Sequence, residues 1–202
     1  MILSLVDRSA DFPRLLDELK SKQLSFADPT KFPHKITSRT VRLRSAPMTL
    51  ADLDLRLLAD YNVFPPNVLV YLSEWEVEHR EMGVGDVILQ QANFPALRSL
   101  SVKMIVGVRI IEMLRSGDKV GFRYGTLEGH VERGTASFYV TLSGEILTLT
   151  IETFSEPANR LNKLVGPIAV VPYQALMTRL ALAWMIERFM ETNPLAGVQG
   201  LR

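Results

Sequence analysis

Cysteine is absent from the 202-residue sequence, which excludes disulfides, thiolate catalysis and cysteine-ligated zinc or iron–sulfur sites. No apolar run is long enough to cross a bilayer, so we expect no membrane span. Neither sign of charge is in excess: Lys and Arg total 23, Asp and Glu total 22, and both are spread along the chain. Because nucleic-acid binding needs a basic patch, we expect no nucleic-acid partner. We expect a cytoplasmic protein by default.

Histidine is scarce, and its three copies, His34, His79 and His130, form no His-x-x-x-His pair of the kind that binds zinc. The glycine patterns of P-loops and dinucleotide-binding folds are missing, as is the Gly-x-Ser-x-Gly turn of many hydrolases. The sequence therefore predicts neither a metal nor a cofactor.

What the sequence does contain is a clear change of periodicity along its length. Residues 11–22 repeat leucines at helical spacing, with Pro13 suited to a first turn, and residues 48–60 do the same behind the capping residue Thr49. Between them, residues 36–44 are rich in β-branched side chains and alternate in polarity, which predicts a strand.

Residues 68–156 change to a period of two, interrupted by turns that contain glycine, and this predicts an antiparallel meander. Within it, Trp75, Val77 and His79 alternate with charged residues, which places His79 on the apolar face of a strand. Residues 102–114 are apolar on both faces, as is typical of a central strand covered on two sides.

From Pro157 to about residue 191 the apolar spacing is helical again, with a break expected near residue 166 because Gly166-Pro167 lies inside it. The order of elements predicts an α+β fold. We expect a curved antiparallel sheet of about seven strands wrapped around a long C-terminal helix, with shorter helices before it. The space between such a sheet and helix is a common place for a pocket.

The densest group of unusual residues is the segment 121–134. Its glycines permit tight turns and bring four side chains into one predicted connecting loop: Tyr124, His130, Glu132 and Arg133. In one interpretation this loop contacts a ligand, His130 carries a proton near neutral pH and Glu132 orients it. In the other it is a hairpin connection whose charges are solvated.

Two further side chains are candidates because of where they fall. His79 either belongs to the core or lines a pocket. Arg109 interrupts the apolar central strand, and since a buried guanidinium needs a partner, it pairs with Glu112, with Glu152 or with an anionic ligand. The predicted ligand-binding residues are therefore Tyr124, His130, Glu132, Arg133, Arg109 and His79.

A family resemblance is carried by the run Gly121-Phe-Arg-Tyr-Gly-Thr-Leu-Glu-Gly-His130, by Phe154-Ser155-x-Pro157 and by Gly166-Pro167. These strings resemble the signature of the family known as domain of unknown function nineteen-ninety. The resemblance implies a helix-grip architecture similar to START domains and the birch pollen allergen, in which the sheet and terminal helix enclose a cavity for hydrophobic ligands. At the start of the strand after the loop, Thr135-Ala136-Ser137 departs from the acidic residues expected there.

We therefore expect one domain over residues 1–202. It comprises an N-terminal helical extension at 1–33, a helix-grip core at 34–192 and a flexible tail at 193–202.

Three functions remain open at this point. The first is a binding or carrier module for a small hydrophobic ligand held between sheet and C-terminal helix. The second is an enzyme that uses the same cavity, with His130 as general acid or base and Tyr124 as a hydrogen-bond donor. The third is a homo-oligomeric interaction protein, such as a homodimer, that pairs through an exposed apolar helix surface including Trp184 and Phe189.

Overall fold

An antiparallel sheet runs through the computed structural model, which describes residues 2–44, 49–94, 101–158 and 171–194. Its strand order is β2-β8-β7-β6-β5-β4-β3, with the short β1 paired to β5, so eight strands form one sheet among the described residues. The strands are β1 (Ile2–Ser4), β2 (His34–Arg42), β3 (Leu69–Ser73), β4 (Val87–Phe94), β5 (Val102–Ser116), β6 (Lys119–Thr126), β7 (Glu132–Ser143) and β8 (Ile146–Pro157).

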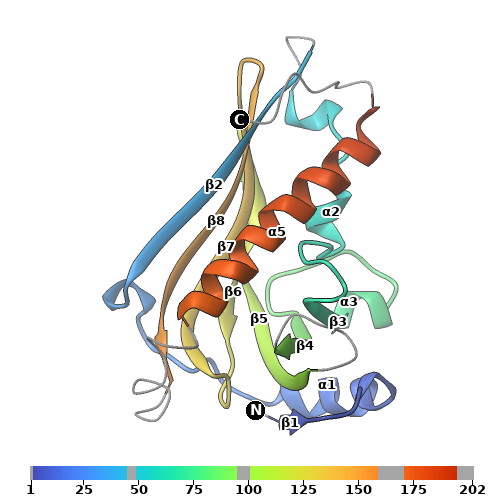
Figure 1. Ribbon diagram of the computed structural model, residues 1–202, viewed down its shortest axis with the longest axis vertical. Coiled ribbons are helices and arrows are strands. Elements are labelled where there is room, and N and C mark those ends of the chain that lie inside the picture. Colours follow the sequence, from blue (N-terminus) through green and yellow to red (C-terminus); the bar gives the residue numbers. More distant parts are fainter. Residues whose placement is uncertain (1, 45–48, 95–100, 159–170, 195–202) are drawn as a thin grey trace.

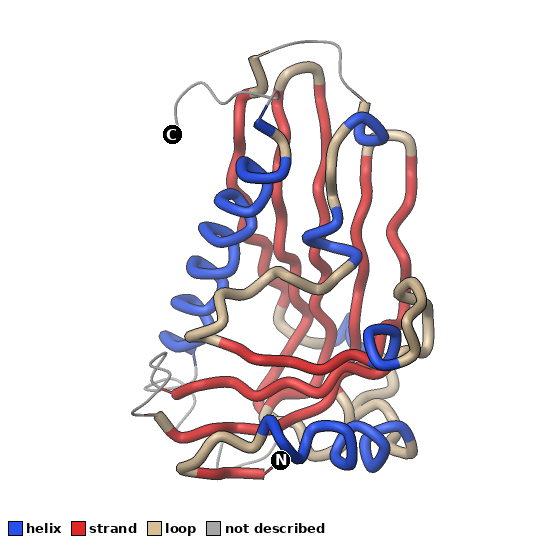
Figure 2. The backbone as a smooth tube through the Cα atoms, turned by 90° about the vertical axis from the view of Figure 1, so that its right-hand side faces the viewer, coloured by secondary structure: helices blue, strands red, loops and turns tan. Residues whose placement is uncertain are grey.

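The predicted meander is confirmed, because β3 to β8 pair with one another in chain order and every pairing is antiparallel. A shift of register between Ile110 and Glu112 in β5 marks a bulge, which bends the strand. Figure 2 shows the result: the long strands stand upright at one end of the sheet and run nearly crosswise at the other. The sheet is therefore curved, with a concave and a convex face.

The C-terminal helix α5 (Val171–Thr192) lies across the concave face (Figure 1), which confirms the predicted grip of sheet on helix. The helix residues that face the sheet are fully or almost fully buried; they are Ala181, Leu182, Met185, Ile186 and Phe189. They join the main core with fully buried sheet residues such as Phe122, Val140, Leu147 and Leu149. The break expected near residue 166 lies outside the described residues.

The surface predicted for pairing with another subunit, which included Trp184 and Phe189, is wrong at Phe189. Phe189 is completely buried in the core beneath α5. Trp184 is half-buried, and its indole Nε1 donates a hydrogen bond to Asn62 Oδ1 at 3.0 Å. The helical spacing of these side chains indicated an apolar stripe correctly, but the sheet of the same chain covers it.

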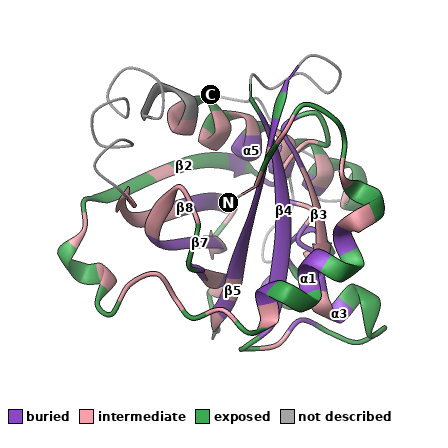
Figure 3. Cartoon of the chain, turned by 90° about the horizontal axis from the view of Figure 1, so that it is seen from below, coloured by how far each residue is buried: buried purple, intermediate pink, exposed green. Residues whose placement is uncertain are grey.

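The convex face is covered by α1 (Phe12–Lys20), which confirms the helix predicted at 11–22. Its apolar side forms a second core with the outer residues of β4 and β5; the cluster contains Phe12, Leu15, Leu16, Leu19, Val87, Leu89, Ile105 and Leu127. Figure 3 shows the buried strands β4 and β5 between α1 and α5. Gly107 permits this approach, since a Cβ there would lie 2.7 Å from Leu19 Cδ2.

The single helix predicted at 48–60 is wrong over its described part, where two short helices stand instead. They are η3 (Leu50–Asp52) and α2 (Arg56–Ala59); two other short 3-10 turns are η1 (Ser9–Asp11) and η2 (Pro29–Lys31). Leu53 is extended between them, at φ −104° and ψ 141°. The Asp54 side chain then accepts the Arg56 N–H and starts a new turn. Thr49 does take part in a capping box, as predicted.

The strand expected through Trp75, Val77 and His79 is also wrong. Residues Glu74–Val77 form the short helix α3, in which Trp75 is buried while Val77 is 48% exposed. His79 follows with φ 53°, a left-handed conformation that ends the turn, and it is exposed. An alternation of only three residue pairs fits a single helical turn as well as a strand. His79 therefore has no place in the core.

Candidate functional site

A cavity of about 410 Å³ lies between the concave face of the sheet and the beginning of α5, within the range of sizes typical of small-molecule sites. Most of its lining is apolar and comes from both the sheet and its neighbours; the apolar residues include Phe64, Leu69, Val106, Phe138, Ile151 and Met177. Farther along the same helix, Met185 and Phe189 are packed directly onto the sheet. The concave face is thus filled at one end of α5 and hollow at the other.

The alternation of the strands decides which side chains reach this cavity. Along β4 to β7 the lining residues are even-numbered apart from Thr135, as in Gln90, Tyr124 and Glu132. The intervening residues point to the convex face. On β8 the odd-numbered residues line the cavity, because β7 pairs even-numbered residues with odd-numbered ones of β8. Thr153 is one of them and lies beside its β2 partner Lys35.

One cluster of polar side chains in the cavity consists of Gln90 and Tyr124, and the buried Tyr61 contacts Gln90 from behind. The Gln90 side-chain amide donates to Tyr61 Oη at 2.5 Å. Burial raises the pKa of Tyr124 to about 12, although hydrogen bonds with Gln90 and Tyr61 oppose the rise. Both tyrosine hydroxyls are therefore neutral at physiological pH and serve as hydrogen-bonding groups. Tyr61 is fully buried and holds a left-handed backbone at φ 56°.

Glu132 is the acidic group of the cavity. It is half-buried at the start of β7, and the Gln174 side-chain amide of α5 donates a hydrogen bond to its Oε1. Burial raises the pKa of Glu132 to about 7, and the Gln174 hydrogen bond opposes that rise. A carboxyl with this pKa gives and takes protons at neutral pH.

His130 lines the cavity beside Glu132 but differs from expectation in its protonation. Its Nδ1 lies 3.0 Å from the Glu132 backbone N and 3.1 Å from the Glu132 carbonyl O, so the backbone engages this nitrogen and leaves Nε2 for other partners. Burial lowers the pKa of His130 to about 4. His130 is therefore neutral near pH 7, and of the two side chains it is Glu132 whose pKa lies near neutral.

The model of one protein family matches residues 61–183, which is more than half of the chain. The chain belongs to the family described as Domain of unknown function (DUF1990). This confirms the resemblance stated from the sequence. The matched segment contains every polar residue of the cavity named so far except Lys35. No curated protein sequence matches this DUF1990 chain.

Two solved structures are similar to the DUF1990 chain in general arrangement. One is the di-domain ARO/CYC StfQ from the steffimycin biosynthetic pathway, with 13% identity, a TM-score of 0.42 and coverage of 77% of this chain and 52% of that one. The other is norcoclaurine synthase from Thalictrum flavum, with 13% identity, a TM-score of 0.43 and coverage of 83% and 99%. The chain spans about half the length of the first protein. Similarity at this level carries no conclusion about function.

Of the six residues predicted to bind a ligand in this DUF1990 domain, the structure brings three to the cavity: Tyr124, His130 and Glu132. The prediction placed them in one connecting loop, but they do not share a loop. Tyr124 lies inside β6 and Glu132 opens β7, with only residues 127–131 between the strands. Tyr124 and Glu132 reach the cavity from one face of two neighbouring strands, and His130 reaches it from the connection between them.

The other three predicted residues lie outside the cavity lining. Arg133 follows Glu132 on the strand, so it points to the convex face and pairs there with Glu156. Arg109 is half-buried, and its Nη2 donates to the Lys20 carbonyl O at 2.8 Å, at the end of α1. The partners proposed for it are engaged elsewhere: Glu112 with Arg123, and Glu152 with His34. His79 is exposed beyond α3.

Among the polar residues of the cavity that were not predicted from the sequence are Gln90 and Gln174. Gln90 carried a signal, since Gln90-Gln91 interrupts the apolar run of a strand whose neighbours are Val, Ile, Leu and Ala. Gln174 carried none, because a glutamine near the start of an amphipathic helix is ordinary.

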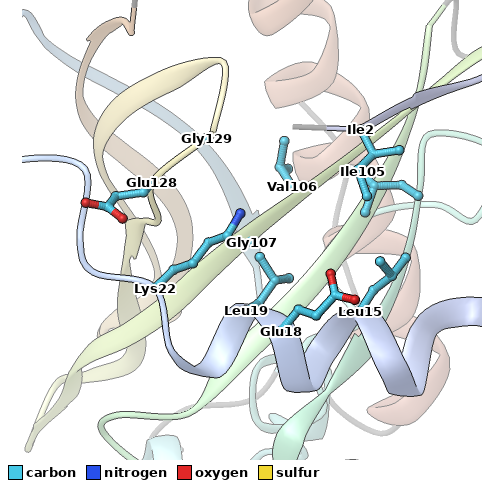
Figure 4. A pocket seen from close by; sticks show the side chains of 10 residues that line it. All are labelled: Ile2, Leu15, Glu18, Leu19, Lys22, Ile105, Val106, Gly107, Glu128 and Gly129. Atoms are coloured by element: carbon cyan, nitrogen blue, oxygen red, sulfur yellow. The ribbon is translucent and has the colours of Figure 1, made fainter.

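A smaller cleft of about 40 Å³ lies on the convex face, where α1 crosses β5. Figure 4 shows Leu15, Leu19 and Lys22 along α1 and the following turn, beneath Gly107 of the strand. This volume suits a few water molecules and no larger guest. The cavity beneath α5 is therefore the better candidate for a functional site.

Groups of three or more potential metal ligands are missing from the described part of the chain. Among the described helices, none combines the length and apolarity that a bilayer span requires.

Proposed function

We propose that this DUF1990 domain binds a small, mostly apolar molecule in the cavity between the sheet and α5. The observation that carries the proposal is the cavity itself, about 410 Å³ in volume and lined mainly by apolar side chains. Protein interiors are normally packed to the density of organic crystals, so an unfilled space of this size forfeits many dispersion contacts. Water gains little in such a space because most of its lining offers no hydrogen bonds.

The arrangement of polar groups supports the same proposal. A site for a mostly apolar molecule has few polar groups, placed to fix the orientation of the guest. Here those groups are Gln90 and Tyr124 from the sheet, together with Glu132 at the start of β7 and Gln174 on α5. The ligand would place its hydrocarbon body against Phe64 and Phe138 and its polar group toward this set.

The test is displacement of the neutral fluorescent probe N-phenyl-1-naphthylamine by 1-nonanol. We expect the wild-type protein to enhance the probe's fluorescence at micromolar concentration and 1-nonanol to reverse the enhancement. Ala136→Leu places three extra carbons in the cavity and should weaken probe binding at least tenfold, and Ala92→Leu on β4 should do the same. Both alanines line the cavity.

Ala183→Leu is the matched control, because Ala183 is exposed on α5 and outside the lining. It should bind the probe as the wild type does. Circular dichroism and thermal unfolding check that each variant is folded. If the wild-type protein binds neither the probe nor 1-nonanol, or if both cavity-filling variants are folded and still bind them fully, the proposal is wrong.

A second candidate function is catalysis in the same cavity, and one observation favours it. Glu132 has a pKa of about 7 in a largely apolar setting, which suits a general acid or base at neutral pH. Small molecules that co-purify with the protein would be incubated with wild-type protein and with Glu132→Gln. An enzyme would convert a bound compound only with Glu132 present, while a carrier would return it unchanged from both.

A further inference from the structure

Glu132 meets no positive charge in the described parts of the chain. Its hydrogen-bond partner is the neutral amide of Gln174, and none of the described basic side chains lies within ion-pair distance of its carboxylate. A half-buried carboxylate without a cation is unfavourable, and proteins normally pair such groups. Among the described residues, Glu132 is therefore one half of an ion pair that lacks its cation.

The charged and titratable groups around Glu132 do not supply the other half. From β2 the cavity receives Lys35, which is exposed; from β6 it receives Tyr124, and from the connection before β7 it receives His130. Tyr124 and His130 are both neutral near pH 7. Arg133 is adjacent in sequence but pairs with Glu156 on the opposite face. Burial raises the pKa of Glu132, and the Gln174 hydrogen bond opposes that rise.

The aromatic lining suits a cation with an apolar body. The ring centroids of Tyr124 and Phe138 are 5.7 Å apart, and those of Phe64 and Phe138 are 5.6 Å apart, so the three form a continuous aromatic wall. Ring faces attract ammonium groups and bury hydrocarbon. An acidic side chain and an aromatic wall in one cavity therefore favour positive charge on the ligand.

We propose that the ligand of this cavity is an amphiphilic amine, whose ammonium group pairs with the Glu132 carboxylate while its hydrocarbon part lies against the aromatic wall. This inference rests on the proposed binding function and adds the chemical class of the ligand. The rival is a neutral molecule with a carbonyl or hydroxyl group, to which protonated Glu132 donates. A neutral guest that covers Glu132 makes ionisation harder, whereas an amine favours it.

The experiment compares 1-nonylamine with 1-nonanol, which share the same nine-carbon chain, by displacement of N-phenyl-1-naphthylamine at pH 7. We expect the wild-type protein to bind the amine at least tenfold more tightly than the alcohol. Glu132→Gln should reduce this ratio to about one and leave 1-nonanol affinity within twofold of wild type. Nonanoic acid should bind most weakly, because its carboxylate is repelled.

Glu128→Gln is the matched control. Glu128 is exposed in the same connection and lies at the small convex cleft, so the same charge change there should leave the amine preference intact. A second measurement is titration calorimetry in two buffers of different ionisation enthalpy. Because about half of the Glu132 carboxyls are protonated at pH 7 before binding, the amine should release about half a proton per site.

The outcomes separate the two proposals. If the alcohol and the probe bind but the amine has no advantage, or if Glu132→Gln keeps that advantage, the amine inference is wrong and the binding function stands. Proton uptake on amine binding would also overturn the inference. If none of these compounds binds the wild-type protein, the binding function itself fails.

Discussion

Gln174, near the start of α5, donates a side-chain hydrogen bond to the carboxylate of Glu132, the first residue of β7. The two residues are 42 positions apart in the chain. Their contact joins the helix to the sheet beside the cavity and holds the acidic group in place. It also limits how far burial raises the pKa of Glu132, because a donated hydrogen bond favours the charged carboxylate.

Gln174→Leu should therefore raise the pKa of Glu132 above its value of about 7. The leucine removes the donor and leaves a side chain of similar size. The measurement is the pH titration of the Glu132 carboxyl carbon by nuclear magnetic resonance. Thr178→Val, one helical turn farther along the lining, is the control and should leave the titration unchanged. An identical pKa in Gln174→Leu and wild type would show that the hydrogen bond does not matter in solution.

Glu132→Gln should change how stability depends on pH. The pKa of Glu132 rises from an ordinary 4.5 to about 7 on folding, so below pH 4.5 both states are protonated and burial of the group has no electrostatic cost. Between pH 4.5 and 7 only the unfolded state ionises, and the wild type loses stability. Between pH 4 and pH 8 the stability of the variant relative to the wild type should therefore increase by about 3 kcal/mol.

Chemical denaturation of both proteins across this range checks the expectation. The difference in stability between the two proteins is the useful quantity. His130 changes stability with pH in the direction opposite to Glu132, and it does so equally in both proteins, so its effect cancels. Its pKa falls from 6.5 to about 4 on folding, so both proteins lose stability as the pH is lowered through that window. A difference that is constant with pH would contradict the raised pKa of Glu132.

Tyr61→Phe should destabilise the protein by about 1–3 kcal/mol, because it removes the buried oxygen that accepts the Gln90 amide. Tyr71→Phe is the control. Its hydroxyl donates to the Asp60 carbonyl at 2.7 Å near the surface, where water can replace it, and we expect a loss of about 0.5–1 kcal/mol. The measurement is urea unfolding. Equal losses of stability in the two variants would mean that the buried hydrogen bond stabilises the protein no more than the exposed one.

Gly134→Ala should prevent stable folding or cost more than about 3 kcal/mol. Gly134 has φ 144°, and a Cβ there would lie 1.9 Å from the Phe154 carbonyl O on the neighbouring strand. Gly117→Ala is the control, since a Cβ at Gly117 meets nothing within 4 Å. We expect the control to lie within about 0.5 kcal/mol of wild type in thermal unfolding. A Gly134→Ala protein as stable as wild type would contradict the described backbone.

The order of the main elements was predictable because period-two alternation and helical spacing arise from local geometry alone. Alternation failed where it was short, as around His79, since a few residue pairs also fit one helical turn. The parity of β4 to β7 could have excluded Arg133, because two adjacent residues of a strand face opposite sides. Gln90 was also within reach, as a polar residue in an otherwise apolar strand.

By itself, the amino-acid sequence determined the α+β class, the meander, the helix on the sheet and the membership signature around Tyr124 and His130. Tertiary structure alone decided that Glu132 meets Gln174, that burial lowers the pKa of His130 and raises that of Glu132, and that part of the concave face is hollow. The physical reason is that periodicity is a property of neighbours along the chain. Burial, pKa and cavity volume depend on distant segments that only folding brings together.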